Sequence, residues 1–455
     1  MRVTRTTKQL LERDPSMQPL FKTIATSKIA ARLFVAAGGC FALMITNAEA
    51  AVQGPPALDS GATAWVLTAS ALVLFMTLPG LTLFYGGLVR TGNLPAVLMR
   101  RCFAITCVVS LVWLAFGYSL VFTPGNGLIG SFGAAFLNGV PEHLMPSGVP
   151  EGGIALFQMT FAIITPALII GAITERARFS FVILFSAIWT AVVYVPIAHW
   201  VWGGGWLAGE GTMDFAGGIV VHTTAGVSAL VAAWLVGPRD GFPKRLAPPH
   251  NPAMTSVGAA MLWVGWFGFN GGSALAANAS AASAVLATQF AACAAGLAWI
   301  TAERWGRGKL TSLGIVSGCI AGLATITPAS GYVGPVGAVV IGAIGGGVSC
   351  FAAGLVKDWL GIDDSLDVFA VHGVGGMLGS LLLAAFALPA LGGSGYGHQM
   401  SAAGQLGAQA IGIAVAVVWS AICTYLIVKL LDATVGARVS LEEERTGLEF
   451  AIPAE

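Results

Sequence analysis

The distribution of hydrophobic and polar positions divides the chain beyond residue 60 into long apolar segments separated by short polar ones. A bilayer core about 30 Å thick needs a helix of about 20 apolar residues. Eleven segments meet or approach that length, near residues 64–88, 102–122, 153–173, 181–199, 216–236, 254–274, 282–302, 312–327, 334–356, 367–388 and 406–431. The eighth of these is short. The pattern predicts an all-α membrane protein with eleven transmembrane helices.

The first 50 residues follow a different pattern. The stretch KIAARLFVAAGGCFALMITNAEA places basic residues before a short apolar run and ends in Ala48-Glu49-Ala50. That order is typical of a secretory signal peptide. We therefore expect a leader over residues 1–50 that is cleaved after Ala50. The region before the apolar run is long and polar, so translation starts at either Met1 or Met17.

The basic residues predict how the helices are oriented. After Ala50, every lysine and arginine lies at the end of an odd-numbered apolar segment or after it, at positions 90, 100, 101, 176, 178, 239, 244, 245, 304, 307, 309, 357, 429, 438 and 445. Loops rich in lysine and arginine stay in the cytoplasm. We therefore expect an N-out/C-in membrane domain over residues 51–431 and a cytoplasmic regulatory tail over residues 432–455.

Composition supports the membrane assignment and excludes several functions. Hydrophobic residues make up 56% of the chain and charged residues only 9%, against about 25% charged residues in soluble domains. The net charge of +1 gives no reason to expect nucleic-acid binding. The seven cysteines have no metal-like spacing, and Gly308-Lys309 is followed by Leu310 rather than by the Ser or Thr of a nucleotide-binding loop. We expect no cofactor, no metal and no enzymatic activity.

The odd number of segments suggests an internal repeat. Two five-helix units, over about 64–236 and 254–388, would enter the membrane from opposite sides, with the eleventh helix at 406–431 outside the repeat. His222 and His372 then occupy matching helices, the fifth and the tenth. Asp214 opens the first of these helices and Asp367 opens the second. The two rings are expected to approach each other near the middle of the bilayer.

An ionisable side chain inside a membrane helix is a candidate functional group. The alternative is that each histidine only links helices through hydrogen bonds. Two histidines at related positions favour function, because two neutral imidazoles can share one proton. Such a pair suits a small, uncharged solute that forms hydrogen bonds. A pore for hydrated metal ions would instead need rows of carbonyls or carboxylates.

Other candidates lie toward the outer ends of the predicted helices. Asp214 stands at a helix start, where capping of free N–H groups is the favoured role over ligand contact. Trp202 precedes three glycines and offers an indole face to a small cation, although an interfacial aromatic belt also explains it. Phe157 and Phe161 share one helix face, and Phe269 lies four residues before Ser273. Taken alone, these phenylalanines are explained as well by packing.

Six longer strings together resemble a known family, the ammonium transporters (Amt/Mep/Rh), and within it the bacterial Amt branch. They are ALVLFMTLPGLTLFYGGLVR (71–90), GAITERARFS (171–180), IAHWVWGGG (197–205), DFAGGIVVH (214–222), GWFGFNGGSA (265–274) and DVFAVHG (367–373). The resemblance runs from about residue 60 to 450. It implies eleven helices with an inverted five-helix repeat, a homotrimer in the cell (inner) membrane, and one pore in each subunit.

The resemblance also implies roles for single residues. Trp202, Phe157 and Ser273 match the outer ammonium site, with Asp214 as the acidic residue near it. Phe161 and Phe269 match the stacked rings that close the pore. His222 and His372 match the twin histidines of a hydrophobic passage. The implied function is recruitment of NH4+, loss of its proton and conduction of NH3, with or without a separate proton.

Two alternatives to an ammonium transporter remain. The first is an ammonium sensor that uses the same fold; such sensors usually carry a fused signalling domain, whereas about 24 residues follow the last predicted helix. The second is a channel for neutral gases, which Trp202 disfavours. The tail TVGARVSLEEERTGLEF resembles the family's cytoplasmic tail, which implies regulation by a PII-type signal protein at the cytoplasmic face.

Overall fold

The computed structural model describes residues 56–90, 93, 95–245 and 248–448. The predicted leader, its cleavage after Ala50 and the alternative start at Met17 lie outside these residues. Within them the chain is helical: only two isolated β-bridges occur, at Leu144–Pro150 and Ala177–Arg438. The predicted all-α class is therefore confirmed for this part of the chain.

The first half of the described chain is a series of α-helices, several of them interrupted by π-helical turns, marked η. These elements are α4 (Ser60–Phe75), η2 (Met76–Leu81), α5 (Thr82–Leu88), α6 (Pro95–Val112), η4 (Trp113–Gly117), α7 (Tyr118–Phe122), α8 (Glu151–Gly171), α9 (Phe179–Trp189), η6 (Thr190–Tyr194), α10 (Val195–Val201), α11 (Trp206–Gly209), η7 (Gly218–Thr223) and α12 (Thr224–Val236). One 3-10 turn, η5 (Ala135–Leu137), lies in the loop before α8.

The second half continues in the same way. Its elements are α13 (Pro252–Gly272), α14 (Ala279–Arg307), α15 (Ser312–Ile326), α16 (Pro335–Gly354), η8 (Leu355–Trp359), η9 (Phe369–Val374), α17 (Gly375–Phe386), α18 (Ala402–Thr434) and α19 (Leu441–Thr446), with 3-10 turns at η10 (Pro389–Leu391) and η11 (Gly397–Gln399). Several helices have a side-chain cap at the N-terminus, formed by residue types that favour this position. The side chains of Asn251, Asn278, Thr311 and Ser401 each accept a backbone N–H of the first helical turn.

Each of the eleven predicted segments falls on a helix of the structure, but not every helix is long and apolar enough to cross a membrane. Nine of the described helices are, by length and composition. The exceptions are α13, which is rich in glycine and ends in Asn270-Gly271-Gly272, and α15, which has 15 residues. A multi-pass membrane protein is confirmed, whereas the count of eleven and the orientation remain predictions.

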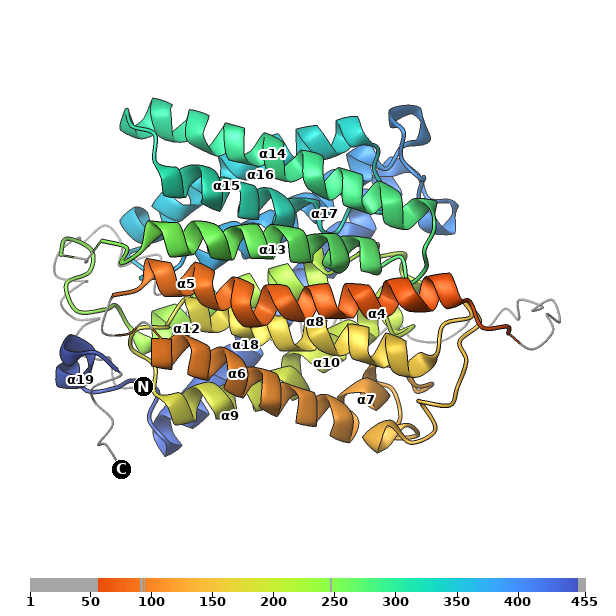
Figure 1. Ribbon diagram of the computed structural model, residues 1–455, viewed down its shortest axis with the longest axis horizontal. Coiled ribbons are helices and arrows are strands. Elements are labelled where there is room, and N and C mark those ends of the chain that lie inside the picture. The colour runs from red at the N-terminus through yellow and green to blue at the C-terminus, as the bar shows by residue number, and fades with distance from the viewer. Residues whose placement is uncertain (1–55, 91–92, 94, 246–247, 449–455) are drawn as a thin grey trace, which may run out of the picture. The chain divides into compact units, whose positions relative to one another are not determined.

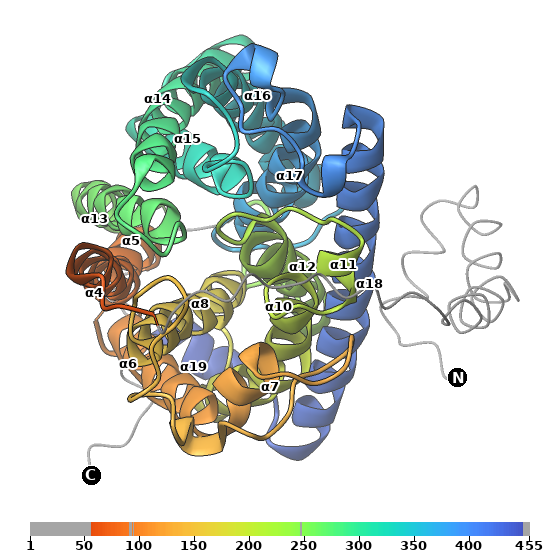
Figure 2. The same cartoon turned by 90° about the vertical axis from the view of Figure 1, so that its right-hand side faces the viewer.

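The helices lie side by side with their axes along the long direction of Figure 1. Seen end-on, α8, α10 and α12 lie inside a ring formed by the other helices, and α18 crosses one side of the bundle (Figure 2). The spans Glu151–Gly171 and Gly218–Val236 are the most enclosed, with 78% of each buried. Because these two helices are shielded from lipid, their side chains are free to line an internal path.

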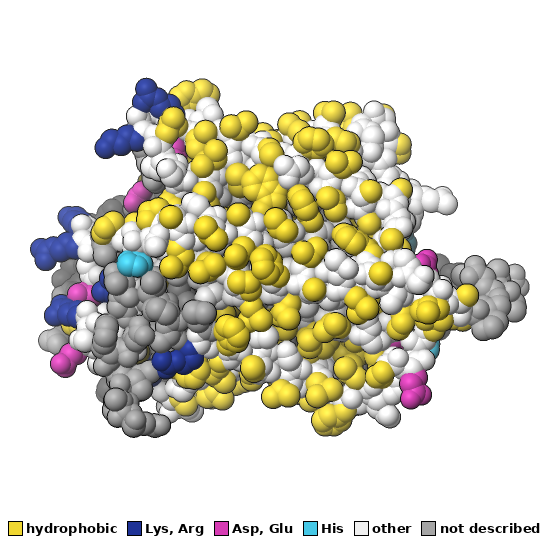
Figure 3. Space-filling model, viewed as in Figure 1, with side chains coloured by type: hydrophobic (Ala, Val, Ile, Leu, Met, Phe, Trp, Pro, Cys, Tyr) yellow, Lys and Arg dark blue, Asp and Glu magenta, His cyan; other side chains and the backbone are white. Residues whose placement is uncertain are grey.

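Charge gathers at one end of the bundle. Lysine and arginine side chains lie at the end where α5, α14 and α19 meet the polar loops, and apolar side chains cover the middle of the visible face (Figure 3). We call this the basic end, defined by Arg90, Arg176, Arg239, Arg304 and Lys357. The other end carries the loop that contains Trp202. An apolar belt beneath a basic end is the arrangement expected for a membrane protein.

Candidate functional site

A column of aromatic and imidazole rings crosses the interior of the bundle. Phe161 on α8 packs edge-to-face against Trp202, with ring centroids 5.9 Å apart, and stacks on Phe269 of α13 at 4.0 Å. The ring of His222 follows Phe269 at 6.0 Å, and His372 follows His222 at 5.1 Å. Each of these residues was a separate candidate in the sequence, and the structure brings them together in one continuous series.

The end of the column at Trp202 is partly open. Trp202 is half-buried, and its indole N–H donates to the backbone carbonyl of Asp214 at 2.8 Å. Phe157 is fully buried and packs edge-to-face on Phe161 at 5.0 Å. The hydroxyl of Ser273, at the end of α13, donates to the carbonyl of Phe269 at 2.8 Å. Because its proton is engaged, the Ser273 oxygen is left with lone pairs that can accept a hydrogen bond.

The carboxylate of Asp214 is a helix cap. Its two oxygens accept the backbone N–H groups of Gly217, Gly218, Ile219 and Val220 at 2.6–3.0 Å. Burial raises the pKa of Asp214 to about 6, against the opposing effect of these four hydrogen bonds. The carboxylate is therefore engaged with backbone groups, and the backbone carbonyl of the same residue holds the indole of Trp202.

The two histidines contact each other directly. The Nδ1 atoms of His222 and His372 lie 3.2 Å apart, and both rings are buried. In such a contact one Nδ1 carries a proton and the other accepts it. The Nε2 atom of His222 has no hydrogen-bond partner among the described residues, and its ring lies against Trp266 and Phe269. An unpaired buried imidazole nitrogen is costly unless something occupies it.

Two glycines allow the histidine helices to approach so closely. Gly226 and Gly376 each lie four residues after a histidine. A Cβ atom on Gly226 would lie 2.2 Å from Gly373, the residue after His372, and one on Gly376 would lie 2.8 Å from the Cβ of His222 and 3.0 Å from the backbone nitrogen of Thr223. The two contacts are reciprocal: each helix places its glycine on the histidine turn of the other.

Both histidine helices begin in the same way. Each histidine lies in a six-residue π-helical turn, η7 or η9. Asp367 directly precedes the helix, as expected, and its backbone carbonyl accepts the N–H of Val371 at 2.9 Å. The side-chain cap of η9 is Asp364, whose buried carboxylate accepts the N–H of Phe369 at 2.7 Å, and the Asp367 side chain pairs with Lys357 at 2.7 Å. Asp364 precedes His372 by eight residues, as Asp214 precedes His222.

The column ends at a cavity on the side of the basic end. The cavity has a volume of about 290 Å³, and its lining includes His372, Tyr85, Ser317, Lys357 and Asp367. Its lining combines apolar residues such as Phe84 and Ile320 with the Lys357–Asp367 ion pair. A molecule that passes the histidine pair therefore meets polar groups directly beyond it.

Comparison with known proteins assigns the chain to a family. The sequence profile of the Ammonium Transporter Family matches residues 64–454. The chain is 44% identical to a putative ammonium transporter of Methanothermobacter thermautotrophicus, over 88% of this chain and 98% of that protein. It is 42% identical to the ammonium transporter of Bacillus subtilis, over 88% and 98% of the two chains. The chain belongs to the ammonium transporter family.

Solved structures of other ammonium transporter family members have the same fold. A structure described as a sensor Amt protein superposes with a TM-score of 0.81 at 34% identity, covering 87% of this chain and 98% of that one. Mep2 of Candida albicans superposes with a TM-score of 0.78 at 36% identity, covering 85% and 88%. The expected family is confirmed, and the sequence relatives are named as transporters rather than as enzymes.

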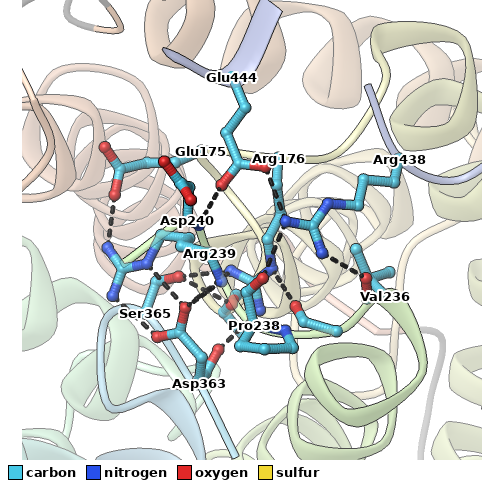
Figure 4. Close-up of polar contacts among 12 residues, drawn as sticks. Glu175, Arg176, Val236, Pro238, Arg239, Asp240, Asp363, Ser365, Arg438 and Glu444 are labelled. Carbon is cyan, nitrogen blue, oxygen red and sulfur yellow. Dashed lines mark hydrogen bonds and ion pairs between the residues drawn. The ribbon is translucent and has the colours of Figure 1, made fainter. Parts of the chain in front are cut away.

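The basic end of this ammonium transporter family member holds a network of buried charges that was not predicted from the sequence (Figure 4). Arg239 pairs with Glu175 and with both oxygens of Asp363. Burial raises the pKa of each carboxyl, but the Arg239 guanidinium outweighs it and holds the pKa of Glu175 and of Asp363 below the ordinary value. Arg176 donates to the carbonyl of Asp363 and to Ser365.

The predicted tail docks on this network. Arg438 pairs with the buried Glu444, whose other oxygen accepts the N–H of Asp240 at 2.8 Å. Figure 4 shows Glu444 reaching from the tail toward the loop that carries Pro238, Arg239 and Asp240. The tail helix α19 starts with a capping box formed by Ser440 and Glu443. The described part of the tail is therefore an ordered element that packs on the loops of the basic end.

Proposed function

We propose that the chain is an ammonium transporter or channel: it recruits NH4+ at Trp202, removes a proton and conducts NH3 past His222 and His372. The observation that carries this proposal is the continuous ring column, which runs from an indole face at one end to a hydrogen-bonding imidazole pair at the other. The family assignment supports ammonium as the transported solute.

The outer site combines the interactions that a small cation needs. Trp202 and Phe157 offer aromatic faces for cation–π attraction, and the Ser273 oxygen offers a lone pair. The buried charge of Asp214 adds negative potential without contacting the ion. Together these groups would replace part of the water shell of NH4+. A neutral gas does not require such a site.

Deprotonation before passage follows from the nature of the column. The rings of Phe161 and Phe269 stack at 4.0 Å and leave no polar partner between them for an ion. An isolated charge at the centre of a bilayer costs on the order of 10 kcal/mol in simulations. Neutral NH3 avoids most of this cost, so the proton leaves at the outer site and travels separately or is left behind.

The histidine pair supplies hydrogen bonds to NH3. Because one Nδ1 donates to the other, one ring has a protonated Nε2 and the other an unprotonated Nε2. The pair therefore offers one donor and one acceptor along the path, and NH3 can use both. The unpartnered Nε2 of His222 belongs to the ring that lies nearest Phe269, the side from which the solute would arrive.

Flux and charge measurements on purified protein in liposomes test this function. Wild-type protein is expected to show ammonium-dependent flux, and the combined His222→Ala and His372→Ala variant is expected to lose any ammonium-evoked current. His398→Ala is a matched control, because His398 is exposed in η11 and away from the column. Absence of flux in the wild type would contradict transport, and an unchanged current in the double variant would contradict proton transfer through the pair.

We infer the remaining architecture from the same resemblance. Eleven spans with an inverted repeat, N-out/C-in, would place the basic end in the cytoplasm and Trp202 outside. The reciprocal contacts of Gly226 and Gly376 support the two-fold relation of the repeat. A homotrimer in the cell (inner) membrane, a leader cleaved after Ala50 and a PII-type partner at the cytoplasmic tail complete the proposal.

An ammonium sensor is the second candidate, because one of the structural neighbours is described as a sensor Amt protein and superposes with a TM-score of 0.81. In a sensor, ammonium at the Trp202 site would change the contacts of the tail without crossing the column. The liposome experiment separates the two: tail movement without flux favours the sensor, and flux favours the transporter.

A further inference from the structure

We infer that the basic end carries a second binding site, separate from the ring column, for a small anion that bears phosphate groups. The site is a cavity of about 350 Å³ between the loops and the tail. Its charged lining consists of Arg90, Arg239, Arg245, Arg445, Glu175 and Asp240. Four guanidinium groups thus face two carboxylates, which leaves the lining with excess positive charge.

The two deepest charges are already paired with each other. Arg239 is 10% exposed and binds Glu175 and both oxygens of Asp363. Glu175 also accepts the backbone N–H and the Nε of Arg90, each at 3.1 Å. These groups form the floor of the cavity and have little remaining capacity for a ligand. The binding groups are therefore those at its rim.

The rim arginines remain available. Arg245 is exposed, and its guanidinium makes no hydrogen bond or ion pair to another described residue. The side chain of Arg445 is 61% exposed and pairs with Asp240, which is itself 38% exposed. Surface ion pairs of this kind contribute little free energy, so the pair can open or share its arginine at small cost.

The charged groups of the cavity lie around Asp240. The hydrogen bond from Arg445 lowers the pKa of Asp240, and the charges of Arg90 and Arg245 lower it further. Arg90, Arg245 and Arg445 line the same cavity as Asp240, and Arg445 contacts its carboxylate directly. A ligand oxygen beside Asp240 would experience the same attraction, and it would satisfy Arg245 as well.

Phosphate is the anion that this arrangement suits. A guanidinium donates through a planar fork that matches two phosphate oxygens, and the tetrahedral phosphate presents oxygens in several directions at once. The two rim arginines come from separate segments, the loop after α12 and α19, and Arg90 in the floor follows α5. The cavity volume lies at the small end of the range for small-molecule sites, about 300–1,000 Å³, which suits a diphosphate-sized group.

The position of the site gives binding a consequence. Arg239 and Leu88 line both this cavity and the one that contains His372. A bound anion would lie beside the end of the ring column and would hold Arg445, and with it α19, on the loops. The chemistry fits either a soluble phosphate ester or the headgroup of an anionic lipid, and the experiment must separate these sources.

Calorimetric titration of full-length protein in neutral detergent with pyrophosphate tests the site. We expect saturable binding that weakens as salt is added. Arg245→Ala and Arg445→Ala should each raise the Kd by about tenfold or more, because each removes charge-assisted hydrogen bonds. Arg304→Ala is the matched control: Arg304 is exposed on α14, bonds only the nearby Gly308 carbonyl, and should bind like the wild type.

Two further arms identify the ligand class. Malonate carries two carboxylates, and malonate binding as tight as that of pyrophosphate would overturn the selectivity for phosphate. Nanodiscs with and without phosphatidic acid test the lipid source: retention of that lipid that depends on Arg245 and Arg445, without pyrophosphate binding, assigns the site to a headgroup. Absence of binding in both arms, or binding that survives both substitutions, would overturn the proposal.

Discussion

Asp214 illustrates how one carboxylate serves a site that it does not touch. Its side chain holds four N–H groups at the start of η7, and its carbonyl holds the indole of Trp202. The same residue therefore fixes the helix that carries His222 and the ring of Trp202, which we propose faces the solute. Removal of the Asp214 carboxylate would disturb both the histidine helix and the position of Trp202. A substitution of Trp202 is therefore the one that reports on cation binding alone.

Trp202→Leu should raise the ammonium concentration needed for half-maximal transport while leaving the pore intact. Cation–π attraction is worth about 0.5–2 kcal/mol, which corresponds to a shift of roughly 2- to 30-fold. Transport measured over a range of ammonium concentrations checks this. Trp202→Phe keeps an aromatic face but loses the N–H that donates to Asp214. If both variants raise the half-maximal ammonium concentration equally, the loss of that hydrogen bond rather than of the ring face is responsible. An unchanged concentration dependence for Trp202→Leu contradicts the cation–π role.

Asp364 provides a side-chain cap at the start of η9 that could have been predicted from the sequence but was not. The stretch DDSLDVFAVHG offers three aspartates before His372, and only the one directly before the helix was named. The signal was present, since Asp214 and Asp364 each precede a histidine by eight residues. The two histidines, by contrast, could be paired from burial and helix position alone. Their hydrogen bond and the stacking of Phe161 on Phe269 depend on contacts between distant helices, which sequence spacing does not give.

Asp364→Ala should destabilise the protein by about 1 kcal/mol, the usual value of a lost helix cap. Asp358→Ala is a matched control, because Asp358 is exposed in η8, close in sequence. Thermal unfolding in detergent measures both. The capping role of Asp364 is contradicted if Asp358→Ala loses as much stability as Asp364→Ala.

Asp364 should also give stability a dependence on pH. Burial, and next the charge of Asp367, raise its pKa to about 6, from about 3.9 in an unfolded chain. For a carboxyl shifted upward, the folded state is favoured while the group is protonated, and this advantage is lost as the pH rises through about 6. Asp364→Asn cannot ionise, so the advantage of wild type over this variant should shrink between about pH 4 and pH 6.5. A difference that is constant across that range would contradict the shifted pKa.

At the scale of helices, the crossing of the two histidine turns depends on glycine. The hydropathy pattern predicted the helices but not their π-helical turns, because a π turn arises where packing forces an extra residue into the helix and leaves no mark in hydropathy. The hydropathy pattern also did not predict how closely η7 and η9 approach each other. The recurring H-x-x-x-G spacing at His222–Gly226 and His372–Gly376 was visible, but its meaning required the observed contact.

Gly226→Ala should therefore separate the histidines. The added Cβ would lie 2.2 Å from the backbone of Gly373, so one helix must shift. Overpacking of this kind costs about 1–3 kcal/mol, and we expect a lower melting temperature together with reduced ammonium flux. Gly407→Ala on α18 is the control, since nothing lies within 4 Å of the position that its added Cβ would take; there alanine should be neutral or slightly stabilising. Normal flux and stability in Gly226→Ala would contradict the close crossing.

For the whole molecule, the charge network at the basic end ties together segments that are far apart in sequence. Glu175 follows α8, Arg239 follows α12, and Asp363 precedes η9. Because the pKa values of both carboxyls lie below ordinary, the stability that these pairs add is present at neutral pH and is lost as the pH falls through the lowered pKa values. The sequence predicted the location of these charges but not their pairing.

The orientation of the molecule can be tested on the same end. Lysines and arginines gather there beside the apolar belt in Figure 3, and the positive-inside rule then places the basic end in the cytoplasm. Ser147 and Lys244 are both exposed, at opposite ends of the bundle. In intact cells a membrane-impermeant maleimide should label Ser147→Cys but not Lys244→Cys, and in inside-out vesicles the pattern should reverse. The wild-type chain, with its own cysteines, provides the background. Labelling of Lys244→Cys in intact cells would reverse the assignment and would place Trp202 on the cytoplasmic side, where it could not recruit external ammonium.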